Sequence, residues 1–172
     1  KTSLSEFSDS KASVLGDYLP TKLGFDEGES FVCACMPGDY SGFLLFAFEN
    51  GKVAKVSLST YNTKSNRRRL TGAYSDKSPL KGLLCMPEEG DVVLYATDGR
   101  ALVLNTAMLS VKTSRTTIGV AVLSLRKKAV LERMVLLGDT EIRNVSRYRS
   151  KSVPAAGALL KDEDRGEIQL EI

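Results

Sequence analysis

The chain repeats the stretch FLLFAFENGK (residues 43–52) as DVVLYATDGR (residues 91–100), which places Gly51 and Gly99 48 positions apart. Each copy is an apolar run followed by an acidic or amide residue, a glycine and a base. Asn-Gly and Asp-Gly favour a two-residue hairpin turn, because they supply the positive φ that such a turn needs. A hairpin that returns at a period of about 50 residues predicts an all-β fold of stacked sheets, each too small to bury a core alone.

The sequence around each hairpin repeats as well. Residues 1–7 match residues 55–61, and the tripeptide Cys-Met-Pro precedes each hairpin, at residues 35–37 and 85–87. A degenerate last copy spans residues 140–160. Each unit also holds a polar stretch that leads to a glycine, at Gly16, Gly72, Gly119 and Gly157. Because Lys1 corresponds to the middle of a unit, we expect the chain to be a piece of a longer protein.

Short runs rich in β-branched and aromatic residues, bounded by Gly, Pro, Asp or Asn, predict a series of strands. They span residues 31–36, 42–49, 52–59, 83–86, 91–97, 100–105, 118–125 and 133–137. Residues 122–137 also fit one or two helical turns, since apolar residues alternate there with charges. We favour strands in that region, because the repeat places them there. With no linker rich in Gly, Ser and Pro, residues 1–172 are expected to form a single domain.

Composition excludes several classes of function. The chain has 172 residues, 42% of them apolar, which is enough for a sizeable core. No apolar run reaches the roughly 18–20 residues that span a bilayer, so we expect no membrane contact. Histidine, the commonest general base and a frequent metal ligand, is absent. The sequence also has no Gly-rich phosphate loop, serine nucleophile elbow or kinase signature, so we expect no catalytic residue, no metal site and no cofactor.

The three cysteines do not form the framework of a secreted, disulfide-linked protein. Cys33 and Cys35 alternate with apolar residues and lie on one face of a predicted strand, and Cys85 holds the equivalent place in the next unit. We expect all three to be reduced and mostly buried, as small apolar residues of a cytoplasmic protein.

Basic residues hold a constant place in the repeat, about four to six positions ahead of the recurring glycine, and others follow each hairpin turn. In a curved stack of sheets, these positions form an interrupted basic belt on the convex rim. Such a belt suits a bent duplex, because phosphate contacts need cations at intervals and no base-reading element. The net charge of +3 does not itself indicate nucleic acid, and ordinary solvated loops are the alternative. The residues predicted to bind DNA are Lys11, Lys52, Arg67, Arg68, Arg69, Arg100, Lys112, Arg115, Arg147, Arg149 and Lys151.

Acidic residues gather elsewhere in the sequence. The three clusters are Asp26, Glu27 and Glu29; Glu88, Glu89 and Asp91; and Asp162, Glu163 and Asp164. The first two precede strands in the repeat, so we expect an acidic edge opposite the belt, which would orient a polyanion. Nothing near the clusters resembles a nucleophile, and solvated turns are the simpler interpretation.

These residues resemble a known family. Residues 48–56 and 96–104 are similar to the blade hairpins in the C-terminal domain of bacterial type IIA topoisomerase A subunits, those of DNA gyrase and topoisomerase IV. Residues 113–120, with Arg115 four positions before Gly119, resemble the family's Arg-x-x-x-Gly-Val segment. The resemblance covers most of residues 1–125 and fades after residue 128.

The resemblance implies a β-pinwheel of about three to four antiparallel blades that exchange an outer strand, in a truncated, open or closed disc. It implies a noncatalytic domain that binds and bends double-stranded DNA around its outer rim. The implied partners are the remainder of the A subunit, which carries the catalytic tyrosine, and the ATPase B subunit, in the cytoplasm at the nucleoid. The Gln-Arg-Arg-Gly-Gly-Lys-Gly box on which full wrapping by gyrase depends does not occur. Its nearest match, residues 65–72, lacks the glycine pair.

Two other classes of protein remain open on the sequence. A propeller-like protein-interaction module would expose apolar or aromatic side chains on one face. A blade-built enzyme would need convergent carboxylates or a metal in a central channel. A salt titration of DNA binding distinguishes a DNA-binding domain from these two classes, because binding dominated by phosphate contacts weakens steeply with salt.

Overall fold

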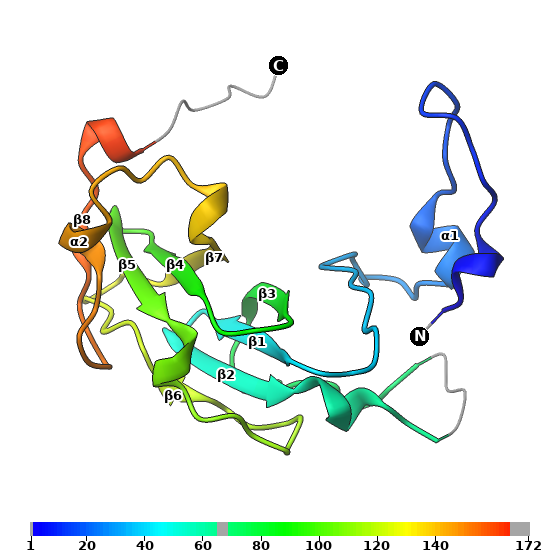
Figure 1. The fold of residues 1–172 in the computed structure, drawn as a ribbon, viewed down its shortest axis with the longest axis horizontal. Coiled ribbons are helices and arrows are strands. Elements are labelled where there is room, and N and C mark those ends of the chain that lie inside the picture. The colour runs from blue at the N-terminus through cyan, green and yellow to red at the C-terminus, as the bar shows by residue number, and fades with distance from the viewer. Residues whose placement is uncertain (1, 65–68, 166–172) are drawn as a thin grey trace.

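The computed structural model describes residues 2–64 and 69–165, and two four-stranded antiparallel sheets form its centre (Figure 1). Blade 1 has the strand order β3-β1-β2-β6 and blade 2 the order β7-β4-β5-β8. The strands of blade 1 are β1 (Phe43–Phe48), β2 (Lys52–Ser57), β3 (Leu80–Met86) and β6 (Val120–Ala121). Those of blade 2 are β4 (Asp91–Ala96), β5 (Arg100–Asn105), β7 (Leu131–Leu136) and β8 (Ala158–Leu159).

Helices in the described part of the chain are short. The α-helices are α1 (Leu19–Leu23) and α2 (Val145–Tyr148). The 3-10 helices are η1 (Leu4–Glu6), η2 (Leu58–Tyr61), η3 (Thr106–Met108), η4 (Leu137–Asp139) and η5 (Asp162–Asp164). The predicted all-β fold is therefore confirmed.

Each blade takes its outermost strand from the next unit of the sequence. Strand β6 follows the hairpin of blade 2 in the chain, yet it pairs with β2 at Lys52 and Val53. Strand β8 pairs in the same way with β5, at Arg100 and Ala101. Strand β6 thus links blade 2 to blade 1, and the period read from the sequence corresponds to one blade.

The hairpin turns lie where the sequence predicts them, but their type differs. Between β1 and β2 the loop has three residues, the Gly51 N–H donates to the Phe48 carbonyl at 2.9 Å, and Gly51 has a φ of 77°. Gly99 has the same role in blade 2, with a φ of 79°. Asn50 and Asp98 are not among the positive-φ residues. The two-residue turn was therefore a wrong prediction, because only the glycine adopts the left-handed conformation, as in a three-residue hairpin loop.

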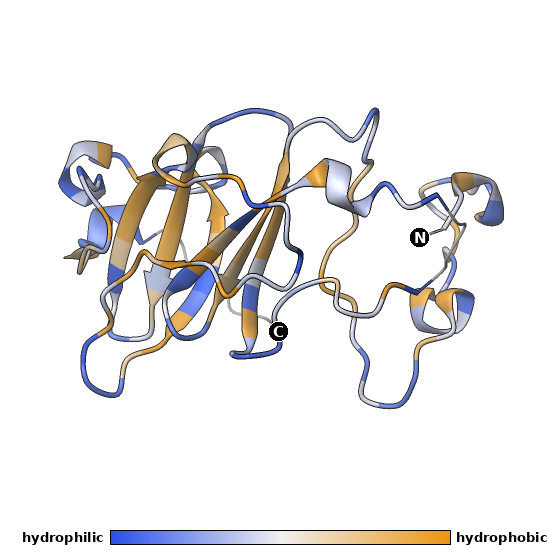
Figure 2. Ribbon diagram, turned by 90° about the horizontal axis from the view of Figure 1, so that it is seen from below, coloured by the Kyte–Doolittle hydropathy of each residue, from blue (hydrophilic) through white to orange (hydrophobic). Residues whose placement is uncertain are grey.

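Apolar side chains pack in three layers across the two blades. The strands of the blades are coloured mostly as hydrophobic in the ribbon (Figure 2). The middle layer lies between the blades, where Leu45 of blade 1 and Leu94 of blade 2 are fully buried. Alternate residues point to the outward faces, with Phe46 on that of blade 1 and Val93 on that of blade 2. Because successive strand residues face opposite sides, every blade needs cover on both faces.

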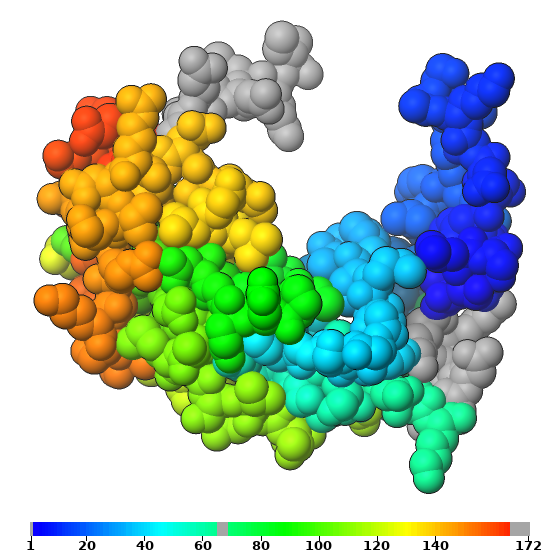
Figure 3. Space-filling model, viewed as in Figure 1, coloured from blue at the N-terminus to red at the C-terminus, as the bar shows by residue number. Residues whose placement is uncertain are grey.

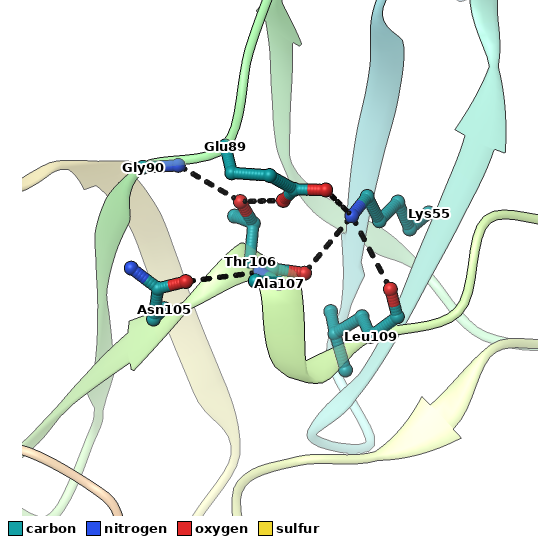
Figure 4. Close-up of polar contacts among 7 residues, drawn as sticks. All are labelled: Lys55, Glu89, Gly90, Asn105, Thr106, Ala107 and Leu109. Carbon is teal, nitrogen blue, oxygen red and sulfur yellow. Dashed lines mark hydrogen bonds and ion pairs between the residues drawn. The ribbon is translucent and has the colours of Figure 1, made fainter.

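A buried lysine connects the two blades (Figure 4). The Lys55 side chain is 2% exposed, and its ammonium donates to the carbonyls of Thr106 at 3.0 Å and Leu109 at 3.2 Å. It pairs with Glu89 and lies 4.2 Å from the centroid of the Phe43 ring. Lys55 belongs to β2, whereas Thr106 and Leu109 follow β5. This contact fixes the position of blade 2 against blade 1.

In outline the described residues form a C (Figure 3). The N-terminal residues make one arm, and blade 2 with residues 140–165 makes the other. Strands β3 and β7 lie toward the hollow of the C, and β6 and β8 lie on its convex side (Figure 1).

Two parts of the predicted strand pattern differ in the structure. Residues 31–36 form no strand and have largely exposed side chains. The predicted strand at residues 118–125 shortens to β6, and the helical alternative for residues 122–137 is wrong, since β7 occupies most of its second half. Two complete blades occur among the described residues, where we expected about three to four.

Candidate nucleic-acid interface

Two equivalent segments follow the outer edges of the blades on the convex side of the C (Figure 1). Outer segment 1, residues 110–121, runs beside β2 and ends in β6. Outer segment 2, residues 149–159, runs beside β5 and ends in β8. Each makes a parallel bridge to its blade at or near its first residue, through Lys112 in the first and Arg149 in the second. Basic residues that the sequence predicted to bind DNA therefore occupy corresponding places.

The recurring glycine lets each outer segment reach the edge of its sheet. Gly119 has a φ of 73°, and a Cβ there would lie 2.4 Å from the Val53 carbonyl oxygen. Gly157 has a φ of 65°, and its Cβ would lie 2.5 Å from the Ala101 carbonyl oxygen. Only glycine fits both the left-handed conformation and the close backbone approach.

Outer segment 1 carries two predicted cations, Lys112 and Arg115. Lys112 is exposed, and the half-buried Arg115 donates from Nη1 to the Thr60 carbonyl at 3.3 Å. Arg115 lies in a polar hollow of about 480 Å³. The hollow is lined by Thr60, Gly72, Thr113, Ser114, Arg115 and Thr116. Hydroxyls and a guanidinium are donors that suit a phosphate. The prediction from the sequence named Arg115 but not the hydroxyls, although Ser114 and Thr116 flank it directly.

Outer segment 2 begins with an arginine that already has a partner. Arg149 donates to both carboxylate oxygens of Asp91, at 3.0 and 2.6 Å. This pairing lowers the pKa of Asp91 and raises that of Arg149. Lys151 is exposed, as is Arg147, whose guanidinium lies 5.9 Å from the centroid of the Tyr148 ring.

Lys52 and Arg100, which follow the two hairpin turns, differ in exposure. Lys52 is half-buried at the start of β2. The Arg100 side chain is 14% exposed, donates from Nη1 to the Gly157 carbonyl at 3.1 Å and pairs with Asp98. Arg100 therefore holds β8 against β5, and its guanidinium is mostly withdrawn from the surface.

Lys11 and Arg69 are the remaining predicted cations among the described residues. Lys11 is exposed. Arg69 pairs with Asp26 at 2.5 Å and with Glu29 at 3.2 Å, which raises its pKa. The expectation of an acidic edge opposite the belt is wrong for these two carboxylates, because they contact a predicted belt residue directly. Arg67 and Arg68 lie outside the described residues.

The three cysteines and the buried Asp164 lie outside the predicted basic belt. Cys33 and Cys35 are exposed and Cys85 is half-buried, so the predicted burial is wrong for the first two; all three thiols are free. Burial and a hydrogen bond with Cys85 raise the pKa of Cys35 to about 11, which disfavours the reactive thiolate at neutral pH. Asp164 is buried and accepts from the Tyr148 hydroxyl at 2.7 Å.

Across residues 2–64 and 69–165, no group of three or more His, Cys, Asp or Glu side chains is placed to hold a metal ion. Within the same ranges, no helix is long and apolar enough to cross a membrane.

Comparison with known proteins supports the fold. No protein-family model and no curated protein sequence matches the chain. The crystal structure of the C-terminal domain of DNA topoisomerase IV matches 80% of this chain and 43% of its own, with a TM-score of 0.65 and 22% identity. The DNA gyrase A C-terminal domain matches 73% of this chain and 47% of its own, with a TM-score of 0.53 and 14% identity. The chain has the β-pinwheel fold. This β-pinwheel covers less than half the length of either structure.

Proposed function

We propose that this β-pinwheel is a noncatalytic domain that binds and bends double-stranded DNA in a bacterial type II DNA topoisomerase A subunit. The fold it shares with the topoisomerase IV and gyrase A C-terminal domains carries the proposal. In this role it acts as a single domain with the remainder of the A subunit and the ATPase B subunit, in the cytoplasm at the nucleoid.

Placement of cations on the convex side supports the proposal. Lys112, Arg115, Arg147 and Lys151 form no ion pair with another described residue, so their charges are available to phosphates. Three of them lie on the outer segments of adjacent blades, where a duplex that follows the curve meets one set after the other. Phosphate contacts of this kind position and bend DNA without reading its sequence.

A salt titration on matched triple variants tests the proposal. The outer variant is Lys112→Gln/Arg115→Gln/Lys151→Gln. The control is Arg126→Gln/Lys127→Gln/Lys128→Gln, which removes the same charges from exposed residues outside the outer segments. Binding of each to mixed-sequence duplexes is measured between low and physiological salt. Every lost phosphate contact makes the negative slope of log K against log salt shallower by about 0.9.

The outer variant should bind unrelated duplexes more weakly by similar factors. Its slope should be shallower by about 2 to 3. The control should retain most of the parent slope. Equal losses in the two variants would show that only net charge matters, and loss for a single sequence would indicate base reading; both results contradict the rim proposal.

A protein-interaction module remains the second candidate because one observation favours it. Exposed apolar side chains line one groove, with Phe31 at 49%, Val32 at 57% and Tyr74 at 42% exposure. If the parent chain binds no duplex at low salt, this candidate takes precedence.

A further inference from the structure

The fold brings the three cysteines together at the outward face of blade 1. Cys85 lies in β3 opposite Leu44 of β1, and it packs against the apolar cluster on that face. Cys33 and Cys35 line the groove of about 1010 Å³ beside the same face, and Leu44 lines it too. Cys35 and Cys85 are 50 positions apart in the sequence, so their proximity is a product of the fold.

The chain after Cys35 is anchored at the end of β3. Gly42 has a φ of 81°, and it approaches Met86 so closely that a Cβ would collide with the Met86 carbonyl oxygen. A turn ahead of Gly42 reverses the chain, closed by a hydrogen bond of 2.8 Å from the Tyr40 N–H. Because Met86 follows Cys85 directly, this turn returns the chain to the side of β3 on which Cys35 meets Cys85.

Cys35 and Cys85 are the two cysteines whose thiols face one another. Burial, and after it the hydrogen bond between these two thiols, raises the pKa of Cys35 to about 11. The Cys33 thiol instead donates to the Ala34 carbonyl at 3.5 Å. All three thiols are free, so Cys35 and Cys85 form a dithiol pair with Cys33 beside it.

One side of this pair is fixed and the other can adjust. Strand β3 pairs with β1 at Cys85 and at both of its neighbours. Residues 30–36 form no strand, and none of their backbone groups bonds to the backbone of another described residue. A disulfide requires its two sulfurs to lie about 2 Å apart. The irregular segment can supply that approach while the sheet keeps its register.

We propose that Cys35 and Cys85 form an intramolecular disulfide by exchange with a small-molecule disulfide of the glutathione class, and that this bond fastens residues 30–36 to β3. One protein thiolate attacks the S–S bond of the small molecule, which forms a mixed disulfide and releases one small thiol. The second protein thiolate attacks the protein sulfur of the mixed disulfide and releases the other. Two electrons and two protons leave the protein with the two small thiols.

The surroundings of the pair set the pace of this exchange. A thiol that keeps its proton exchanges slowly at neutral pH, so the bond should form only under sustained oxidising conditions and should open again in excess reduced thiol. Once formed, a cross-link between positions so far apart in the sequence restricts the unfolded chain and stabilises the folded one. This inference concerns the chemistry of the groove and does not depend on DNA binding.

Equilibration with oxidised and reduced glutathione at a series of fixed ratios tests the proposal on the full chain. Remaining thiols are then blocked and counted by mass spectrometry, and peptide mapping identifies the linked residues. At oxidising ratios the number of free thiols should fall from three to one, that of Cys33, with no glutathione retained. No loss of thiols at any ratio, or a bond that includes Cys33, would overturn the proposal.

Three single variants separate the pair from its neighbour. Cys33→Ser removes an exposed thiol but leaves the pair, so it should form the same bond at the same ratios. Cys35→Ser and Cys85→Ser should form no intramolecular bond. Non-reducing electrophoresis shows whether the linked species is a single chain, and a bond between two chains would contradict the proposal.

Urea denaturation tests whether the bond fastens the segment. The unfolding midpoint of the oxidised parent should lie above that of the same sample after reduction. Cys35→Ser, treated in the same way, should show no such shift. An oxidised parent with an unchanged or lower midpoint would show that the bond strains the fold, which contradicts the proposed fastening.

Discussion

Blades 1 and 2 share strand order and register but differ in how their outward faces are covered. Even the irregularity is shared, since the ladder to the inner strand shifts after Ala47 in blade 1 and after Tyr95 in blade 2. Residues 140–165 close the outward face of blade 2, where Tyr148 is 1% exposed. The outward face of blade 1 borders a groove of about 1010 Å³, which Phe31, Tyr74 and Leu83 help to line. Strand pairing is thus the same in both blades, whereas different parts of the chain cover their outward faces.

A buried carboxylate organises the cover of blade 2. Asp164 accepts from the Arg143 N–H at 2.8 Å and from the Tyr148 hydroxyl, which in turn accepts from the Lys161 N–H at 3.1 Å. The Tyr148 hydrogen bond is the main cause that lowers the pKa of Asp164. These contacts tie residues 143–148 to residues 161–164 over one blade face.

Removing the cover of blade 2 should have the largest effect on stability. Tyr148→Ala removes a fully buried ring and its hydroxyl, and should lower the free energy of unfolding by about 3 to 5 kcal/mol. Tyr61→Ala is the matched change in blade 1, where the ring is only half-buried beside the groove, and should cost about 1 to 2 kcal/mol. Urea denaturation measures both. Equal losses would mean that the two outward faces are covered equally well.

The lysine between the blades comes next. Lys55→Met removes the ion pair with Glu89 and leaves the carbonyls of Thr106 and Leu109 without their donor, which should cost about 3 kcal/mol. In blade 2 the equivalent residue is Val103, which is fully buried and apolar. Lys52→Met, at a half-buried lysine of the same strand, should change stability by less than about 0.5 kcal/mol. A loss as small as that for Lys55→Met would show that the buried ammonium is dispensable.

The ion pair between Lys55 and Glu89 should also make the free energy of unfolding depend on pH in the acid range. Burial raises the pKa of Glu89, but hydrogen bonds from Lys55 and Thr106 outweigh it, so the pKa lies below its ordinary 4.5. A lowered pKa in the folded state stabilises the protein above the ordinary value, and that contribution disappears as pH falls through the lowered one. The stability difference between the parent and Glu89→Gln should therefore shrink on acidification below about pH 4.5.

Local sequence patterns predicted the strands and turns that recur in the repeat. They did not predict contacts between residues that lie far apart in the chain. Hairpins and inner strands follow from local alternation and turn residues, and Gly119 and Gly157 mark the outer strands. Residues 31–36 have strand composition, but without a partner strand they stay irregular and leave Cys33 exposed. The pairing of Arg69 with Asp26 joins residues 43 positions apart, which no local pattern encodes.

The turn glycines offer a finer comparison of the blades. Alanine at either Gly51 or Gly99 is strained by the positive φ, at a cost of about 1 to 2 kcal/mol. At Gly51 the new Cβ would also lie 2.3 Å from the Leu123 carbonyl oxygen, whereas at Gly99 nothing lies within 4 Å. Gly51→Ala should therefore destabilise the protein by about 1 to 3 kcal/mol more than Gly99→Ala. Equal thermal shifts would mean that the backbone at Leu123 moves aside freely.

The smallest expected effect separates the two outer segments. Arg149 is 42% exposed and paired with Asp91, whereas Lys112 has no described acidic partner. Arg149→Gln should lower stability by less than about 1 kcal/mol, because exposed ion pairs contribute little. That difference should vanish as pH falls through the lowered pKa of Asp91, below its ordinary 3.8, since the folded carboxylate then takes up a proton.

If the outer segments bind DNA as proposed, Lys112→Gln should weaken binding more than Arg149→Gln, because Arg149 must leave Asp91 before it meets a phosphate. Stronger weakening by Arg149→Gln would show that its pair with Asp91 opens readily, and that the two segments contact DNA alike.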